Sequence, residues 1–260
     1  MAYTEKDKKG FMLIAGVVVA LVAVVGVKLA VGTPAKPEPD GCVGKVTANT
    51  VIVLDHSESL TQQTLAEVSA RALAHVVNTA QVNERVTVFN ISDQSKKELV
   101  PSFSRCKPPQ EGNRAIENTR GLEKTFKATF LEPLQAVLKA EPVGAKESPV
   151  AQALIDISLT HYLRGERNSL LIFSDMLENT PKFSMYGCID SKQAVAKFRE
   201  SRKGAQERPR FRSTNVSLNM IPRLDVAKPT LKCRDQMWEW FFGDNEGAGA
   251  RSDIDYLPGA

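Results

Sequence analysis

The stretch TANTVIVLDHSES at residues 47–59 decides the fold class. Its apolar, β-branched run ends at Leu54, which is typical of a strand buried on both faces of a sheet. Asp55 follows directly. Residues 60–77 then carry apolar side chains at three- and four-residue spacing, which predicts an amphipathic helix. The local order is therefore strand, polar loop and helix.

The rest of the chain repeats this alternation. We predict strands over 85–92, 169–174 and 215–222, a short charged antiparallel edge strand over 96–104, no regular structure over 106–121, and helices over 122–139 (bent at Pro133), 150–163, 191–202 and 234–242. Strands alternating with helices imply an α/β fold, a doubly wound (Rossmann-like), mostly parallel sheet with one antiparallel edge strand. The predicted domain spans 42–243, followed by a flexible, glycine-rich tail over 244–260.

An apolar segment precedes this domain. Residues 11–27 run 17 positions without a charge, and the stretch to Val31 is long enough to cross a bilayer as a single transmembrane helix. Three lysines in the predicted cytoplasmic leader, residues 1–10, place the rest of the chain outside the inner membrane, in the periplasm of a bacterium. A cleavable signal peptide is the alternative, although its apolar region is usually only ~7–15 residues long. A proline-rich linker over 32–41 leads to the domain.

Composition and cysteines limit the possible functions. Beyond residue 32 the chain holds 30 basic and 28 acidic side chains, which argues against a disordered polyelectrolyte or a nucleic-acid binder. Four cysteines in an oxidising compartment predict two disulfides. The expected positions at the sheet edges favour the pairs Cys42–Cys106 and Cys188–Cys233, with the two other connectivities open. No cysteines and histidines of this chain have the spacing that is typical of a zinc site.

Polar side chains follow two of the predicted strands. Asp55, Ser57 and Ser59 alternate in an extended turn and so point the same way. Ser148 precedes a helix, and Asp175 ends the second buried strand. In sheets of this kind, ligands bind where the strand order reverses, beyond the carboxyl ends of the strands. Five oxygen-bearing groups suit a hard cation, Mg²⁺ or Mn²⁺.

These residues resemble the metal-ion-dependent adhesion site (MIDAS) of von Willebrand factor A (VWA) domains. The resemblance rests on the DxSxS segment at 55–59, the later Ser148-Pro149 and the strand ending in Asp175, and it covers residues 45–243. It implies that Asp55, Ser57, Ser59 and Asp175 hold the metal, directly or through water. Ser148 stands where the family usually has threonine. The family implies a protein-binding module in which an acidic residue of the partner completes the coordination of the metal.

The same residues allow other interpretations. Asp55, Ser57, Ser59 and Ser148 are also good helix caps and turn formers. Asp55 and Asp175 around Mg²⁺ suit a hydrolase, a phosphoesterase or nuclease, as the alternative to a non-enzymatic module. A third alternative is a structural component of the cell envelope whose metal site does not function. The sequence does not indicate the oligomeric state.

Two further segments have a structural and a functional interpretation. The basic stretch 197–212 is expected to be a solvated surface, with anionic lipid headgroups as the alternative partner. The aromatic cluster at 238–242 is expected to dock a helix on the sheet rather than to anchor an interface.

Overall fold

The computed structural model of the chain describes residues 5–31, 38–57, 59–92, 99–111, 119–142, 144–243 and 251–257. The chain divides into two units, Met1–Pro37 and Glu38–Ala260. The first unit holds one helix, α1 (Glu5–Val31), over the segment predicted as the anchor. Among the residues that the structure describes, no helix is both long and apolar enough to cross a membrane, so the transmembrane helix predicted over 11–31 is not found.

The second unit is built on a six-stranded sheet. Its strands lie in the order β3-β2-β1-β4-β7-β8. The bounds are β1 (Ala48–Asp55), β2 (Arg85–Ile91), β3 (Phe103–Cys106), β4 (Arg167–Ser174), β7 (Thr214–Met220) and β8 (Arg251–Tyr256). Every neighbouring pair is parallel except β2 and β3. The predicted α/β class, with a mostly parallel sheet and one antiparallel edge strand, is confirmed. Two short strands, β5 (Asn179–Thr180) and β6 (Phe183–Ser184), pair separately.

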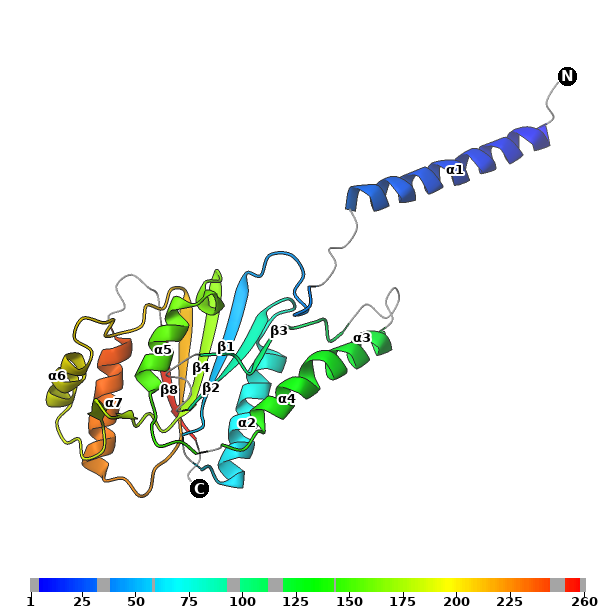
Figure 1. The fold of residues 1–260 in the computed structure, drawn as a ribbon. Helices are drawn as coiled ribbons and strands as arrows, with labels where there is room; N and C mark the ends of the chain where they lie inside the picture. The colour runs from blue at the N-terminus through cyan, green and yellow to red at the C-terminus, as the bar shows by residue number, and fades with distance from the viewer. Residues whose placement is uncertain are drawn as a thin grey trace. The chain divides into compact units, whose positions relative to one another are not determined.

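Helices cover both faces of the sheet (Figure 1). One face carries α2 (Gln62–Asn78), α3 (Thr119–Phe126), the π-helix η2 (Lys127–Leu131) and α4 (Glu132–Leu138); the other carries α5 (Val150–Leu159), the 3₁₀ turn η3 (His161–Leu163), α6 (Ser191–Ser201) and α7 (Lys228–Phe242). Strand β1 serves both layers because its side chains alternate between the faces. Val51 and Val53 pack with α5 and α7, whereas Ile52 and Leu54 pack with α2 and α4.

The predicted helix over 122–139 is divided. A five-residue π-helical turn, η2, separates α3 from α4 immediately before Pro133. Proline has no N–H to donate and its ring collides with the carbonyl four residues earlier, so the wider turn relieves the clash. The bend expected at Pro133 is therefore accommodated by the turn that precedes it.

Two ends of the sheet differ from the prediction. The antiparallel edge strand β3 begins at Phe103, after Pro101, and residues 96–98 of the strand predicted over 96–104 lie outside the described part of the chain. At the other edge the predicted flexible tail is wrong over 251–256, because β8 forms there and pairs with β7. Leu257, which follows β8, is only 3% exposed. Buried apolar surface holds the end of the chain on the sheet.

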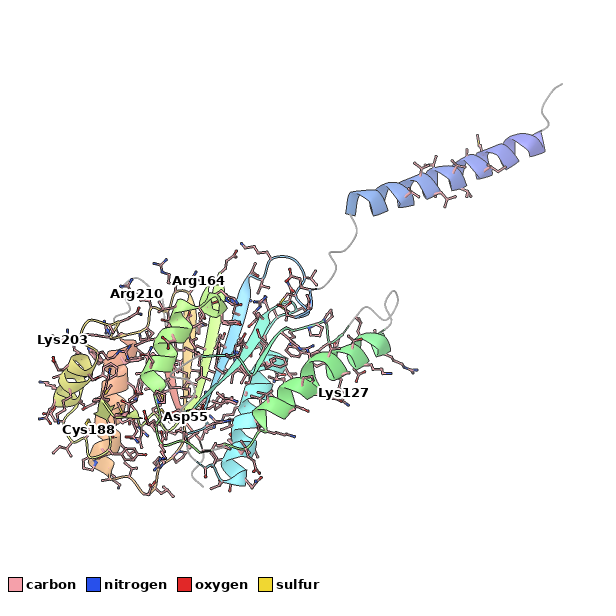
Figure 2. The ribbon with its side chains drawn as sticks, in the orientation of Figure 1. Asp55, Lys127, Arg164, Cys188, Lys203 and Arg210 are labelled. Carbon is pink, nitrogen blue, oxygen red and sulfur yellow. A yellow bond between two sulfur atoms is a disulfide. The ribbon has the colours of Figure 1, made fainter. Side chains whose placement is uncertain are left out.

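Both predicted disulfides are confirmed. Cys42 is bonded to Cys106, closing 64 residues, and Cys188 to Cys233, closing 45. The first bond ties the segment before β1 to the end of β3. The second ties the loop before α6 to α7. Cys106 pairs in register with Arg85 at the amino end of β2, and Figure 2 shows Cys188 at the same end of the sheet as Asp55.

Candidate functional site

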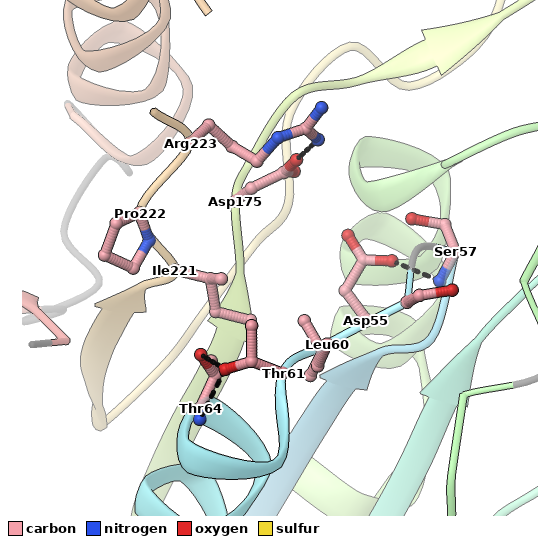
Figure 3. Close-up of a pocket in the computed structure, with 10 residues that line it drawn as sticks. Asp55, Ser57, Leu60, Thr61, Thr64, Asp175, Ile221, Pro222 and Arg223 are labelled. Carbon is pink, nitrogen blue, oxygen red and sulfur yellow. Dashed lines mark hydrogen bonds and ion pairs between the residues drawn. The ribbon is translucent and has the colours of Figure 1, made fainter. Parts of the chain in front are cut away.

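The candidate site lies at the carboxyl edge of the sheet, between β1 and β4. The chain runs from β1 to β2 on one side and later returns to β4 on the other, so the strand order reverses here. Asp55 is the last residue of β1, and Asp175 directly follows β4. A pocket of about 130 Å³ opens at this point, and it is lined by Asp55, Ser57, Ser59, Leu60, Thr61, Thr64, Asp175, Ile221, Pro222 and Arg223 (Figure 3).

Asp55 is held by three hydrogen bonds. Its Oδ1 accepts from the backbone N–H of Ser57 at 3.0 Å. Its Oδ2 accepts from the hydroxyls of Ser148 at 3.1 Å and Ser174 at 2.7 Å. Because the side chain is buried and its neighbours come from three separate segments, the carboxylate has a fixed position at the floor of the pocket.

Asp175 faces a cation from the chain itself. Its Oδ1 accepts from the backbone N–H of Leu177 at 2.9 Å, and its Oδ2 accepts from Nη1 of Arg223 at 2.6 Å. The side chains of Arg223 and Asp175 are 15% and 10% exposed, so the pair is screened only weakly by solvent. Figure 3 shows the guanidinium directed at the Asp175 carboxylate.

The loop after β4 is held by hydrogen bonds with Ser174 and with two side chains of helix α7. Met176 adopts a positive φ of 57°, a conformation that costs free energy for a residue other than glycine. Its N–H donates to Oγ of Ser174, and its carbonyl accepts from Nε1 of Trp238 at 2.6 Å. Nη1 of the buried Arg234 donates to the carbonyl of Asp175. Helix α7, whose aromatic cluster packs on the sheet as expected, therefore positions this side of the site.

Ser148 does not cap helix α5. Its hydroxyl donates to Asp55 instead, and Pro149 at the cap position makes no side-chain hydrogen bond. The N–H of Ala151, in the first turn, donates to the carboxylate of Glu178 at 2.8 Å. Complete burial raises the pKa of Glu178 to about 8, although that hydrogen bond and the charge of Arg202 act against the shift.

The structure brings the five predicted residues to one place. Asp55, Ser57, Ser59 and Asp175 line the pocket, and Ser148 contacts Asp55 from outside the lining. Sequence reasoning missed Ser174, Arg223 and Arg234. Ser174 was within reach, because it is the last residue of the predicted strand before Asp175. Nothing local to Arg223 or Arg234 signals their approach to Asp175, 48 and 59 residues away in sequence.

The oxygen chemistry of the pocket fits a hard divalent cation. Asp55, Asp175, Ser57 and Ser59 line it, and their carboxylates and hydroxyls are groups that Mg²⁺ and Mn²⁺ accept as ligands. Within the described ranges, no three His, Cys, Asp or Glu side chains gather closely enough to hold a metal. Binding would thus depend on the hydroxyls and on water as well as on Asp55 and Asp175.

Two ionisable groups near the site have pKa values below the ordinary range. His56 is buried beside the site, and burial lowers its pKa, so the imidazole is neutral at pH 7 despite the charge of Asp55. It is not among the residues that line the pocket. Arg223 also donates to both carboxylate oxygens of Asp225, at 2.9 Å each, and this contact lowers the pKa of Asp225 to about 2.

Comparison with known proteins gives likeness only at the level of structure. No protein-family model matches the chain, and no curated protein matches it. One similar solved structure is the ArnB paralog VWA2 from Sulfolobus acidocaldarius, at 12% identity and a TM-score of 0.39, covering 81% of this chain and 42% of that one. The chain therefore spans less than half the length of that protein. Another is the SpRpn10 VWA domain, at 10% identity and a TM-score of 0.33, covering 82% of this chain and 90% of that one.

Both of these structures are VWA domains. At these values the likeness carries no further conclusion. What the chain itself shows is a mostly parallel sheet, an antiparallel edge strand β3, and acidic residues after β1 and β4 at the point where the strand order reverses.

Proposed function

We propose that the chain is a protein-interaction module whose VWA-like domain binds one divalent cation, Mg²⁺ or Mn²⁺, at the carboxyl edge of its sheet. The observation that supports this most directly is the pocket itself. Asp55, Ser57, Ser59 and Asp175 come from two distant loops and line one opening. Their oxygens suit a hard cation, and Ser148 and Ser174 orient the Asp55 carboxylate behind them.

The partner is proposed to supply an acidic side chain. With two carboxylates and hydroxyls around it, a divalent ion keeps a position that faces solvent, where a further carboxylate gains a strong charge-assisted contact. The chain's own residues position the ligands and shield the floor of the pocket. They leave its mouth to the partner.

Metal-dependent stability tests this proposal. The melting temperature of the full chain should rise with Mg²⁺ and fall back with EDTA, because an ion that binds only the folded state stabilises it by mass action. Asp55→Ala should abolish the response. Glu166→Gln is the matched control, since Glu166 is an exposed carboxylate at the opposite, amino edge of the sheet, paired with Lys45. A wild-type melting temperature that ignores Mg²⁺ contradicts the proposal.

Partner capture tests the interaction step separately. The chain should retain a binding protein from an envelope extract in Mg²⁺ and lose it in EDTA, and Asp55→Ala should behave like the EDTA sample. Equal retention under all three conditions would favour the third alternative, a structural envelope component with a non-functional site.

We further propose that the chain is a single-pass protein of the inner membrane with its domain in the periplasm. This rests on the uncharged run at 11–27, the lysines that precede it and the two disulfides, which are typical of an oxidising compartment. Resistance of the protein to extraction from membranes by alkaline carbonate, with protease access only from the periplasm, is the expected result. Release into the soluble fraction contradicts the anchor.

The hydrolase alternative depends on the same two carboxylates. Among the described residues that line the pocket there is no histidine, and the ionisable groups of that set are Asp55, Asp175 and Arg223. A panel of phosphoesters tests it directly. Hydrolysis that is lost in Asp175→Ala would establish an enzyme in place of the binding module.

A further inference from the structure

Arg223 brings a positive charge to the candidate metal pocket. Its Nη1 lies 2.6 Å from Oδ2 of Asp175, and Arg223 lines the same pocket as Asp55, Ser57 and Ser59. One oxygen of the Asp175 carboxylate, a predicted metal ligand, is therefore already in contact with a cation. No motif of the predicted metal site includes an arginine.

The contact between Arg223 and Asp175 is built rather than incidental. Both side chains are largely buried, at 15% and 10% exposed. The ring of Tyr186 lies beside the guanidinium, with Arg223 Cζ 6.0 Å from the ring centroid and Nη1 3.3 Å from the hydroxyl. Nε and Nη2 engage the two oxygens of Asp225. The guanidinium thus has a fixed fork on Asp225 and one remaining nitrogen that reaches Asp175.

This division of the guanidinium allows two arrangements. Asp225 is exposed, with 69% of its side chain accessible, so it can follow a small movement of Arg223 and keep its two hydrogen bonds with the guanidinium. Nη1 can then leave Asp175 while Nε and Nη2 stay on Asp225. A divalent ion bound beside Asp55 would repel the guanidinium and would compete with it for the Asp175 carboxylate.

We propose that Arg223 is a resident cation that occupies Asp175 in the metal-free protein and sets the affinity of the pocket for divalent metal. The proposal rests on the function proposed above and adds its regulation. Arg223 neutralises Asp175 when the metal is absent. Metal binding requires the Arg223 contact to be exchanged, which weakens the affinity and couples it to any partner that draws Arg223 away.

Calorimetric titration of Mg²⁺ into the full chain tests this inference. Arg223→Gln should lower the Kd by about tenfold, because the competing charge is removed from a weakly screened pocket. Arg223→Met, which also lacks the charge but keeps the length of the aliphatic stem, should give the same shift. Arg210→Gln is the matched control and should leave the Kd unchanged, since this exposed arginine lies at the other edge of the sheet from Asp55 (Figure 2).

A second measurement needs no metal. In EDTA, melting temperatures of Asp175→Asn, Arg223→Gln and the double variant form a thermodynamic cycle. The structure predicts coupling, with the double variant no less stable than the worse single variant, because each substitution breaks the same ion pair. Additive losses show that the two side chains do not pair in the metal-free protein and overturn the proposal.

The outcomes separate this inference from the proposed function. If wild type binds Mg²⁺ and Arg223→Gln binds it equally well or more weakly, the inference is overturned and the proposed function is not. Binding by Arg223→Gln but not by wild type supports the inference and contradicts the metal dependence of the wild-type module. An absence of Mg²⁺ binding in both proteins overturns both.

Discussion

Ser174 and Ser148 both donate a hydroxyl to Oδ2 of Asp55, but only Ser174 also accepts from a backbone N–H, that of Met176. Both residues are buried. Ser174→Ala should therefore lower the free energy of unfolding in EDTA by about 2 kcal/mol, because it leaves a buried N–H without its acceptor. Ser148→Ala should cost about 1 kcal/mol. Denaturant melts measure both, and a larger loss for Ser148→Ala contradicts the described geometry.

The raised pKa of Glu178 predicts that the free energy of unfolding depends on pH. Its folded pKa is raised to about 8, chiefly by burial, with the charge of Asp55 adding to the shift and that of Arg202 opposing it. Between about pH 4 and pH 8, the folded state therefore keeps a proton on Glu178 that the unfolded state has released. The contribution of this group is fully present below about pH 4 and is lost as the pH rises through about 8.

Glu178→Gln tests this pH dependence. Glutamine keeps an oxygen for the N–H of Ala151 and cannot ionise, so the variant should match wild type near pH 5 and exceed it at pH 8 by on the order of 3 kcal/mol. Unfolding free energies in EDTA across this range give the comparison, with Glu166→Gln as the exposed control. Parallel pH profiles for wild type and Glu178→Gln would show that Glu178 titrates normally.

At the residue scale, much of the site could be predicted from the chain alone. The alternation of Asp55, Ser57 and Ser59 after a buried strand determines which side chains share a direction, and the end of a second strand places Asp175 near them. Arg223 could not be predicted, because its contact depends on where the loop after β7 turns. That turn is set by packing rather than by a local pattern.

The packing of strand β8 predicts how much this element contributes to stability. It pairs with β7, Leu257 is buried behind it, and Tyr256 donates from its hydroxyl to Asp235 on α7 at 2.8 Å. Leu257→Asp should lower the free energy of unfolding by about 3 kcal/mol, because it places an unpaired charge against the core. Leu224→Asp is the matched control, since Leu224 is 82% exposed. Equal stability of the two variants would return 251–257 to a mobile tail.

The elements that were predicted well have a strong period or a sharp end. The helix expected over 60–77 is α2, begun at Thr61, whose hydroxyl accepts from the N–H of Thr64. The elements that were predicted poorly depend on distant contacts. The glycine-rich, acidic composition of 244–260 is typical of a mobile tail, and only the open edge of β7 makes a strand there favourable. The basic stretch 197–212, expected to be a solvated surface, has an exception in Arg208, which donates to the carbonyls of Trp240 and Gly243.

At the scale of the whole molecule, the Cys42–Cys106 disulfide ties the entry of the domain to its edge strand. It closes 64 residues, so its removal frees the unfolded chain considerably. Cys42→Ser with Cys106→Ser should lower the free energy of unfolding by about 4 kcal/mol on the loop-entropy account. Thermal melts of the oxidised wild type and the double variant measure this. A loss much below this value indicates that the unfolded chain is already restricted.

The two ends of the sheet have different roles in the fold. The domain is entered at the amino edge, where Lys45 pairs with Glu166, while Asp55 and Asp175 lie at the carboxyl edge. The alternation of strands and helices predicted this division, because parallel strands put all their carboxyl ends together. It did not predict the charge balance at the site, which depends on the cation that Arg223 adds.

Electron paramagnetic resonance of bound Mn²⁺ tests directly whether a cation binds between Asp55 and Asp175. Free Mn²⁺ is distinguished from bound ion, so the number of ions per chain follows from a titration. Wild type should bind one ion, Asp55→Ala and Asp175→Asn should bind none, and Glu166→Gln should bind as wild type does. Equal Mn²⁺ binding by wild type and both site variants, or none by wild type, would contradict a cation site between Asp55 and Asp175.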